Sequence, residues 1–163
     1  MLKKNVVAII PARGNSKRIP GKNCKKFNGK LVIVSTIEKL KKSRIFDKII
    51  VSTDSKKIAL LSRKYGAEIP FIRPKRLAND KASGGAVMSH GIRFLIKEGY
   101  KFDYACFVFA PNPFLRISDL KKGFQKIRAK KCDFVFAATS YQFPFFRSFT
   151  ISDKKGIKML FSK

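Results

Sequence analysis

The residues best suited to chemistry gather in one short stretch, Pro11–Asn23, which follows an apolar run. Gly14 lets the backbone approach a ligand closely, and free N–H groups with Lys and Arg side chains are the donors that a triphosphate requires. The stretch is not a Walker A loop, because six residues separate Gly14 from Gly21-Lys22, and Asn23 follows in place of Ser or Thr. Four cations fall within ten residues: Arg13, Lys17, Arg18 and Lys22. The loop predicts a triphosphate site, with a solvated basic turn as the alternative.

The elements that must position this loop alternate between strands and helices. The run Asn5–Ile10, ended by Pro11, predicts a buried parallel strand. Further strands are predicted at Asp47–Thr53, Phe102–Ala110 and Asp133–Thr139, with a short extended piece at Ile69–Ile72 and a hairpin of Phe149–Ser152 and Ile157–Phe161. Helices are predicted around Val32–Leu40, from an Asp54/Ser55 cap to Tyr65, over Ala86–Lys97, and from a Ser118/Asp119 cap to Ala129.

This alternation predicts an α/β fold with a mostly parallel sheet and helices on both faces. Ligands on such sheets bind beyond the carboxyl ends of the strands. The loops after Ile10, Ser52, Ala110 and Ala138 are therefore expected to form the site.

Composition excludes several classes of protein. The 163 residues are expected to form one domain (residues 1–163), and the 45% hydrophobic content excludes wholesale disorder. No apolar run approaches the roughly 20 residues of a membrane span, so we expect a cytoplasmic protein without a membrane partner. The three cysteines, Cys24, Cys106 and Cys132, lack the spacing of a metal site, and Cys106 is expected in the core.

The formal net charge of +27 leaves two interpretations open. A basic surface is typical of nucleic-acid binding, but lysines also solvate helix surfaces. Here they are spread through every segment, without a recognition-helix, zinc-finger or aromatic RNA-binding signature. Specific nucleic-acid binding is therefore the weaker hypothesis.

The stretch Ile10-Pro-Ala-Arg-Gly-Asn-Ser-Lys-Arg-Ile-Pro-Gly-Lys-Asn23 resembles the opening motif of the sugar-acid cytidylyltransferases, which activate sialic, legionaminic and pseudaminic acids as CMP-sugars. The similarity covers nearly all of the chain and continues through Ile50–Asp54, Tyr65–Pro74, Leu77–Asp80 and Asp119-Leu120. It implies a Rossmann-like nucleotidyltransferase fold. Phe109–Leu115 and Thr139–Arg147 are most similar to the pseudaminic branch, although Pro111 and Phe146 stand where Thr and Gln are usual.

The resemblance also implies roles for individual residues. The cations of the loop Pro11–Asn23 would neutralise the charge of the transition state and orient the leaving pyrophosphate, with Arg13 and Lys22 as the catalytic pair. The positions that match nucleotide-binding ones are Arg13, Gly14, Ser16, Lys17 and Lys22 for the triphosphate, Asn23 for the ribose, and Arg73 and Ser83 for the cytosine. Asn112 lies in the segment that matches the sugar site, and Arg147 suits the carboxylate of the sugar acid. His90 is interpreted as structural or sugar-adjacent.

The expected reaction transfers CMP from CTP to a nine-carbon sugar acid with Mg²⁺ as cofactor. The family's metal carboxylates lie on an Asp-x-Asp motif that this sequence lacks, so no residue is assigned as a metal ligand, although Asp54 and Asp80 lie near the expected ligand edge. The chain is therefore expected to be incomplete at its C-terminus, weakly active, and doubtful as the homodimer usual in the family. The alternatives are a nucleotide-binding remnant or subunit without turnover, and a basic nucleic-acid-binding protein.

Overall fold

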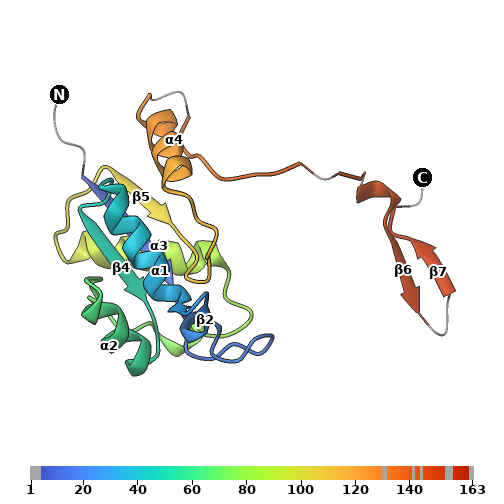
Figure 1. The fold of residues 1–163 in the computed structure, drawn as a ribbon, viewed down its shortest axis with the longest axis horizontal. Helices are drawn as coiled ribbons and strands as arrows, with labels where there is room; N and C mark the ends of the chain where they lie inside the picture. Colours follow the sequence, from blue (N-terminus) through green and yellow to red (C-terminus); the bar gives the residue numbers. More distant parts are fainter. Residues whose placement is uncertain (1–4, 130–131, 141, 144, 153–155, 162–163) are drawn as a thin grey trace.

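The computed structural model describes residues 5–129, 132–140, 142–143, 145–152 and 156–161. A parallel sheet with strand order β4-β1-β5 lies at the centre of the fold (Figure 1). Its strands are β1 (Val6–Pro11), β4 (Lys48–Ser52) and β5 (Tyr104–Phe107). Ile9 of the central strand β1 lies opposite Ile50 on one side and Phe107 on the other. The predicted parallel strands at these three places are confirmed, although β5 is shorter than the predicted Phe102–Ala110.

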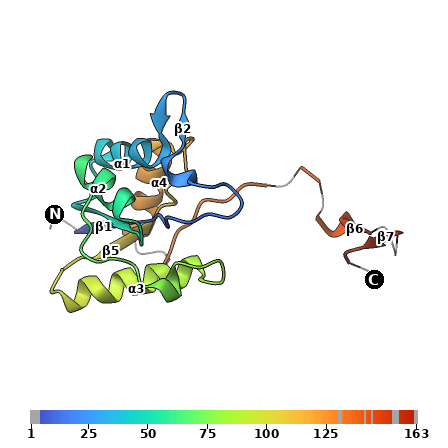
Figure 2. The same cartoon turned by 90° about the horizontal axis from the view of Figure 1, so that it is seen from below.

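Helices cover both faces of this sheet, as the sequence predicts (Figure 2). One face carries α3 (Gly84–Lys97). The other carries α1 (Val32–Ser43), α2 (Lys56–Lys64) and α4 (Ile117–Arg128). None of the helices in the described part of the chain is long and apolar enough to cross a membrane.

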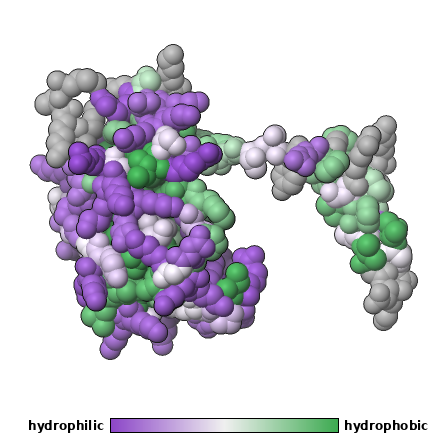
Figure 3. Space-filling view, viewed as in Figure 1, coloured by the Kyte–Doolittle hydropathy of each residue, from purple (hydrophilic) through white to green (hydrophobic). Residues whose placement is uncertain are grey.

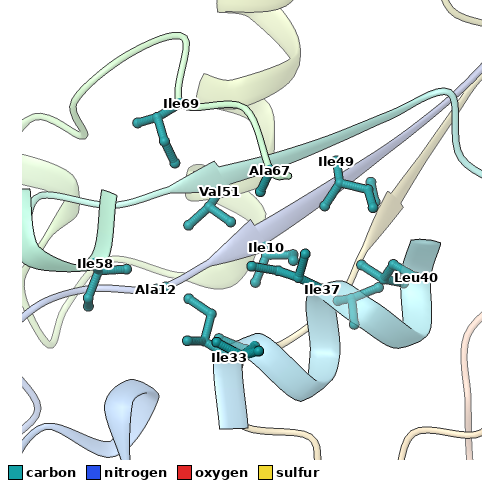
Figure 4. Packing of buried hydrophobic residues seen from close by; sticks show 14 of the residues in the cluster. Ile10, Ala12, Ile33, Ile37, Leu40, Ile49, Val51, Ile58, Ala67 and Ile69 are labelled. Carbon is teal, nitrogen blue, oxygen red and sulfur yellow. The ribbon is translucent and has the colours of Figure 1, made fainter. Parts of the chain in front are cut away.

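Two apolar layers join the helices to the sheet because successive side chains of β1 point to opposite faces. Ile10 packs with Ile33 and Ile37 of α1 (Figure 4). Ile9 packs on the opposite face with Ile50 and with Leu95 of α3. The apolar residues of α1 recur every three or four positions, so one face of the helix is buried and Lys41 and Lys42 stay exposed.

Short elements complete the part of the fold formed by residues 5–129, which we call the body. A tight hairpin of β2 (Lys26–Phe27) and β3 (Lys30–Leu31) turns through Asn28 and Gly29, whose φ angles are 47° and 77°. Single turns of 3-10 helix lie at η1 (Lys22–Cys24) and η2 (Lys75–Leu77). The expected extended piece is present as isolated parallel bridges that join Glu68 to Ile50 and Ile72 to Thr53.

The chain leaves the body after α4, and we call the described part of residues 132–161 the C-terminal arm (Figure 1). The predicted strand Asp133–Thr139 is wrong, because these residues form no strand in the described part of the chain. Phe134 and Phe136 are 72% and 74% exposed, so the apolar pattern that predicted the strand is not buried. A strand forms where a neighbour supplies ladder hydrogen bonds, and β1 is the only described strand that pairs with β5.

The predicted hairpin at the end of the arm is confirmed. It follows η3 (Phe145–Arg147) and pairs β6 (Phe149–Ser152) with β7 (Gly156–Met159) in antiparallel register. Ile151 and Ile157 lie opposite one another, and both are exposed. Apolar residues therefore gather on the hairpin surface, whereas the visible face of the body is largely hydrophilic (Figure 3).

Candidate active site

A cavity of about 470 Å³ lies beyond the carboxyl ends of β1 and β5. This is the edge of the sheet at which the sequence predicts a ligand. The residues that line it come from the basic loop, from the segment before α3, from α3 itself and from the end of β5: Pro11, Arg13, Lys17, Arg18, Lys22, Asn23, Arg73, Leu77, Asn79, Asp80, Ala82, Gly84, Val87, Phe107, Phe109 and Pro111. All four cations of the loop belong to this set.

The loop is fastened to the end of β4 at Gly14. The Gly14 N–H donates to Oδ1 of Asp54 at 2.7 Å. A Cβ atom at Gly14 would lie 2.9 Å from Cβ of Ser55, closer than side chains approach, so glycine is required by this contact. Asp54 is therefore the anchor of the loop, and Ser55 caps α2 by accepting from the N–H of Ile58 at 3.4 Å.

Asn23 closes the other end of the loop. Its Nδ2 donates to the carbonyl oxygen of Arg13 at 2.8 Å. The residue is only 3% exposed, and its Oδ1 has no hydrogen-bond partner among the described residues. A buried acceptor without a donor is costly, and this one lies in the cavity lining, so it suits a ligand hydroxyl.

Arg13 and Lys17 of the basic loop both contact the carboxylate of Asp80. The Arg13 guanidinium bonds to Oδ1 of Asp80, and Nζ of Lys17 lies 3.4 Å from Oδ2 of Asp80. The hydrogen bond from Arg13 is the main cause that lowers the pKa of Asp80 below its usual range; desolvation opposes it, and the hydrogen bond from Lys17 and the charges of both cations add to the lowering. Asp80 is thus an anion at neutral pH, and it lines the cavity together with the cations of the basic loop.

Arg73 is a buried cation, only 4% exposed, at the edge of the same cavity. Its Nε donates to Oγ of Ser52 at 3.0 Å, and its Nη2 donates to the Ser52 carbonyl. Burial lowers the pKa of Arg73; the charge of Arg13 acts in the same direction, and Asp54 opposes it. The two bonds to Ser52 hold the guanidinium in a fixed plane at the end of β4.

The end of β5 supplies an apolar wall. Phe107 and Phe109 meet edge to face with ring centroids 5.2 Å apart, and Phe109 is 61% exposed. The segment that follows is fixed to α1, because Oγ1 of Thr36 donates to the Ala110 carbonyl at 2.7 Å. The cavity lining therefore includes a cationic wall, formed by Arg13, Lys17, Arg18 and Lys22, and an aromatic wall, formed by Phe107, Phe109 and Pro111.

Four other predicted site residues lie outside the cavity's described lining. Gly14 anchors the loop through its bond to Asp54, and Ser16 is buried. Ser83 caps α3 by accepting from the N–H of Ala86 at 3.1 Å, and its neighbours Ala82 and Gly84 line the cavity. Asn112 lies in the turn after β5, where its carbonyl accepts from the N–H of Leu115 at 3.2 Å.

Two further predicted residues stand apart. The backbone of Arg147 belongs to η3 in the arm, and its side chain lies outside what the structure describes; Arg147 is not among the described residues that line the cavity. His90 packs edge to face on Phe71 at 4.9 Å between ring centroids. Burial, with the charges of Arg76 and Arg73, lowers the pKa of His90, so the ring is neutral near pH 7.

Comparison with known proteins decides the family. A model of the cytidylyltransferase family matches residues 7–153. Pseudaminic acid cytidylyltransferase of Campylobacter jejuni is 38% identical over 96% of this chain and 68% of the relative. This chain belongs to the cytidylyltransferase family. N-acylneuraminate cytidylyltransferase of Escherichia coli is 37% identical over 56% of this chain and 22% of its own length.

Solved structures agree on the cytidylyltransferase fold. A CMP:2-keto-3-deoxy-manno-octonic acid synthetase complexed with CTP aligns with a TM-score of 0.63 at 24% identity. The alignment covers 77% of this chain and 48% of that synthetase, so the chain spans about half of the solved structure. The predicted Rossmann-like nucleotidyltransferase fold is confirmed.

The described residues of this chain offer no preformed cluster of metal ligands. They contain no cluster of three or more His, Cys, Asp or Glu side chains that would hold a metal ion. The two carboxylates near the cavity are both engaged, Asp54 by the Gly14 N–H and Asp80 by Arg13 and Lys17. No step of the mechanism is therefore assigned to a metal held by these residues.

The sequence patterns did not predict that Asp54 anchors the basic loop or that Asp80 pairs with Arg13 and Lys17. They also did not predict that Phe107 and Phe109 line the cavity. Asp54 looked like a helix cap because Asp and Ser are both favoured at that position. Phe107 and Phe109 belong to an apolar run that predicts a buried strand, and nothing in the run shows that the strand ends at Phe107. Only the shortened β5 exposes Phe109 to the cavity.

Proposed function

We propose that this chain carries the nucleotide site of an enzyme that transfers CMP from CTP to a nine-carbon sugar acid with release of pyrophosphate. Pseudaminic acid is the favoured acceptor, because the relatives matched over 96% of this chain include pseudaminic acid cytidylyltransferases. Sialic and legionaminic acids are the alternatives. The observation that carries the proposal is the cavity wall on which all four loop cations lie beside the buried, unpartnered Oδ1 of Asn23.

The cationic wall suits the triphosphate. In the reaction the anomeric hydroxyl oxygen bonds to the α-phosphorus. The bond from the α-phosphorus to the oxygen that bridges it to the β-phosphorus breaks, so that this oxygen leaves with pyrophosphate, and the hydroxyl proton passes to solvent. Lys22 and Arg13 neutralise the charge that grows on the departing pyrophosphate, which is where fixed cations lower a barrier. The Gly14–Asp54 bond keeps the loop from moving as that charge develops.

Asn23 and Arg73 suit the nucleoside. The Oδ1 atom of Asn23 accepts a ribose hydroxyl, since a buried acceptor needs a donor and a sugar hydroxyl supplies one. Arg73 offers N–H donors to the oxygen and ring nitrogen of cytosine, the acceptors that distinguish this base from an adenine edge. Ser83 lies at the start of α3, within a segment that lines the cavity at Ala82 and Gly84.

The aromatic wall suits the sugar acid. Phe107, Phe109 and Pro111 present apolar surface to the carbon skeleton and acyl groups of the acceptor. Asn112 follows directly, and the proposal keeps it as a sugar contact. Arg147 stays a prediction for the sugar carboxylate.

The nucleotide site is tested by calorimetric titration of CTP into the wild type and Lys22→Ala. We expect the substitution to cost about 1.5–3 kcal/mol of binding free energy, because a hydrogen bond to a charged group is lost. ATP and GTP should bind the wild type more weakly than CTP. Lys97→Ala, at the exposed last turn of α3, is the matched control and should leave CTP affinity unchanged. Equal CTP affinity in the wild type and Lys22→Ala contradicts the proposed site.

A second candidate function is nucleotide binding without turnover. It is favoured by the lack of a metal-ligand cluster in the described residues. Pyrophosphate release from CTP, Mg²⁺ and either pseudaminic or N-acetylneuraminic acid separates the two functions. Release that depends on one of these acids supports the transferase, and CTP binding without release supports the alternative. Mg²⁺ as cofactor, the cytoplasm as location and the lack of a specific nucleic-acid partner remain parts of the proposal.

A further inference from the structure

One carboxylate lies among the cations that line the cavity. Arg13 and Lys17, both from the basic loop, contact the two different oxygens of the Asp80 carboxylate, which lies 67 residues from Arg13 in the sequence. Arg13, Lys17 and Asp80 all line the cavity. The carboxylate thus takes up hydrogen-bonding capacity that the proposed function requires for phosphate.

The position of Asp80 is fixed by its neighbour Asn79. The Oδ1 atom of Asn79 accepts from the backbone N–H groups of Lys81 and Ala82 at 2.9 and 3.0 Å, and its Nδ2 donates to the carbonyl of Arg76 at 3.0 Å. This Asx turn folds the segment back on itself and directs residue 80 toward the basic loop. The contact is therefore built by two separate loops and does not depend on one mobile side chain.

Stability does not explain the arrangement. The side chains of Asp80 and Lys17 are 46% and 82% exposed and that of Arg13 is 20% exposed, and ion pairs that share an exposed partner contribute little to folding. Placed beside an anionic ligand, the same carboxylate is unfavourable, since like charges repel at short range. A carboxylate here has an effect chiefly on what the cavity binds.

We propose that Asp80 is a specificity-determining residue whose carboxylate competes with the phosphates of the nucleotide for Arg13 and Lys17. The inference rests on the proposed function and adds to it. A triphosphate or pyrophosphate carries several charges and displaces the single carboxylate from both cations. A phosphodiester, with one charge, displaces it poorly. Asp80 thereby raises the negative charge that a ligand must carry in order to bind. It pairs again with Arg13 and Lys17 when pyrophosphate leaves.

The test compares Asp80→Asn with the wild type for three probes: CTP, inorganic pyrophosphate and cytidine. Asn keeps the size of the side chain and removes its charge, so we expect CTP and pyrophosphate to bind about three- to tenfold more tightly, in the range of one exposed ion pair. Cytidine has no phosphate, and its affinity should stay the same. Asp80→Glu, which keeps the charge, should bind CTP like the wild type.

The matched control is Asp119→Asn, which removes the same charge from a pair with Arg116 at 3.0 Å outside the cavity lining. It should leave the affinity for pyrophosphate unchanged, which separates a local effect from a change of net charge. Circular dichroism of each variant confirms the fold. If the wild type binds CTP and Asp80→Asn binds it equally or more weakly, the role of Asp80 is refuted and the proposed function stands. If the wild type binds neither CTP nor pyrophosphate, the proposed function itself fails.

Discussion

The body and the C-terminal arm both contain apolar stretches, but these are buried in the body and exposed in the described part of the arm. In the body, β1 is a run of apolar residues covered on one face by α1 and on the other by α3. In the arm, Phe134, Phe136 and the hairpin residues are equally apolar, yet they are exposed. Apolar pattern alone therefore does not place a segment, because burial also requires a surface that covers it.

The functional residues follow the same division. Among the described residues, those that line the cavity all belong to the body, between Pro11 and Pro111. Each of its anchors is a contact between body elements, as in the bond from Gly14 to Asp54 and that from Thr36 to Ala110. A change at a buried or cavity-lining residue of the body should therefore disturb stability or CTP binding, and a matched change at an exposed apolar residue of the arm should disturb neither.

The largest expected effect comes from shortening a buried isoleucine. Ile37 of α1 is fully buried between the helix and the sheet. Ile37→Ala should lower the free energy of unfolding by about 2–5 kcal/mol, because it loses burial and leaves a cavity. The matched change in the arm, Ile157→Ala, removes the same atoms from a side chain that is 70% exposed and should cost within about 0.5 kcal/mol.

Chemical denaturation of the two isoleucine variants measures this difference. A loss above 2 kcal/mol in Ile157→Ala would show that the hairpin is covered in solution, and the contrast between body and arm would be wrong.

A smaller effect is expected from crowding the anchor of the basic loop. In Gly14→Ala the new methyl would lie 2.9 Å from Cβ of Ser55, so the loop must shift and lengthen its bond to Asp54. Overpacking of this kind costs about 1–3 kcal/mol, and we expect it to appear as weaker CTP binding. Gly85→Ala is the control, since its Cβ would meet only Oγ of Ser83 at 3.9 Å. Calorimetry that finds unchanged CTP affinity in Gly14→Ala would remove the anchor from the site.

Much of the body could be predicted because its signals are local. The run Val6–Ile10 predicts a buried strand by composition, and the spacing of Ile33, Ile37 and Leu40 predicts α1 by period. The loop between them was predicted as the ligand site because it follows a parallel strand at its carboxyl end. These inferences need only a few adjacent residues. The structure confirms the strand and the helix, and the loop as a ligand site stays a prediction.

The rest depends on contacts between distant segments. The segment Asp133–Thr139 has the composition of a strand, but a strand also needs a partner strand to bond to. The sequence pattern does not reveal whether a described strand such as β5 serves as that partner. The pairing of Arg13 with Asp80 joins residues from two loops, and no periodicity predicts which carboxylate reaches which cation. Ser16 and Ser83 match family positions, yet they lie outside the cavity's described lining, so their part in binding stays a prediction.

The smallest effect on stability is expected for the aromatic residues of the arm. Phe134 stacks on Phe136, with ring centroids 6.1 Å apart, and it remains largely exposed in the described part of the chain. Phe134→Ala should change the free energy of unfolding by about 0.5 kcal/mol or less, because an exposed ring loses little burial. Exposed rings also favour association, so Phe134→Ala should reduce any self-association seen by sedimentation velocity. A large loss of stability in Phe134→Ala, dependent on protein concentration, would mean that the arm is buried against a second copy, and the arm would then belong to the folded unit as much as the body does.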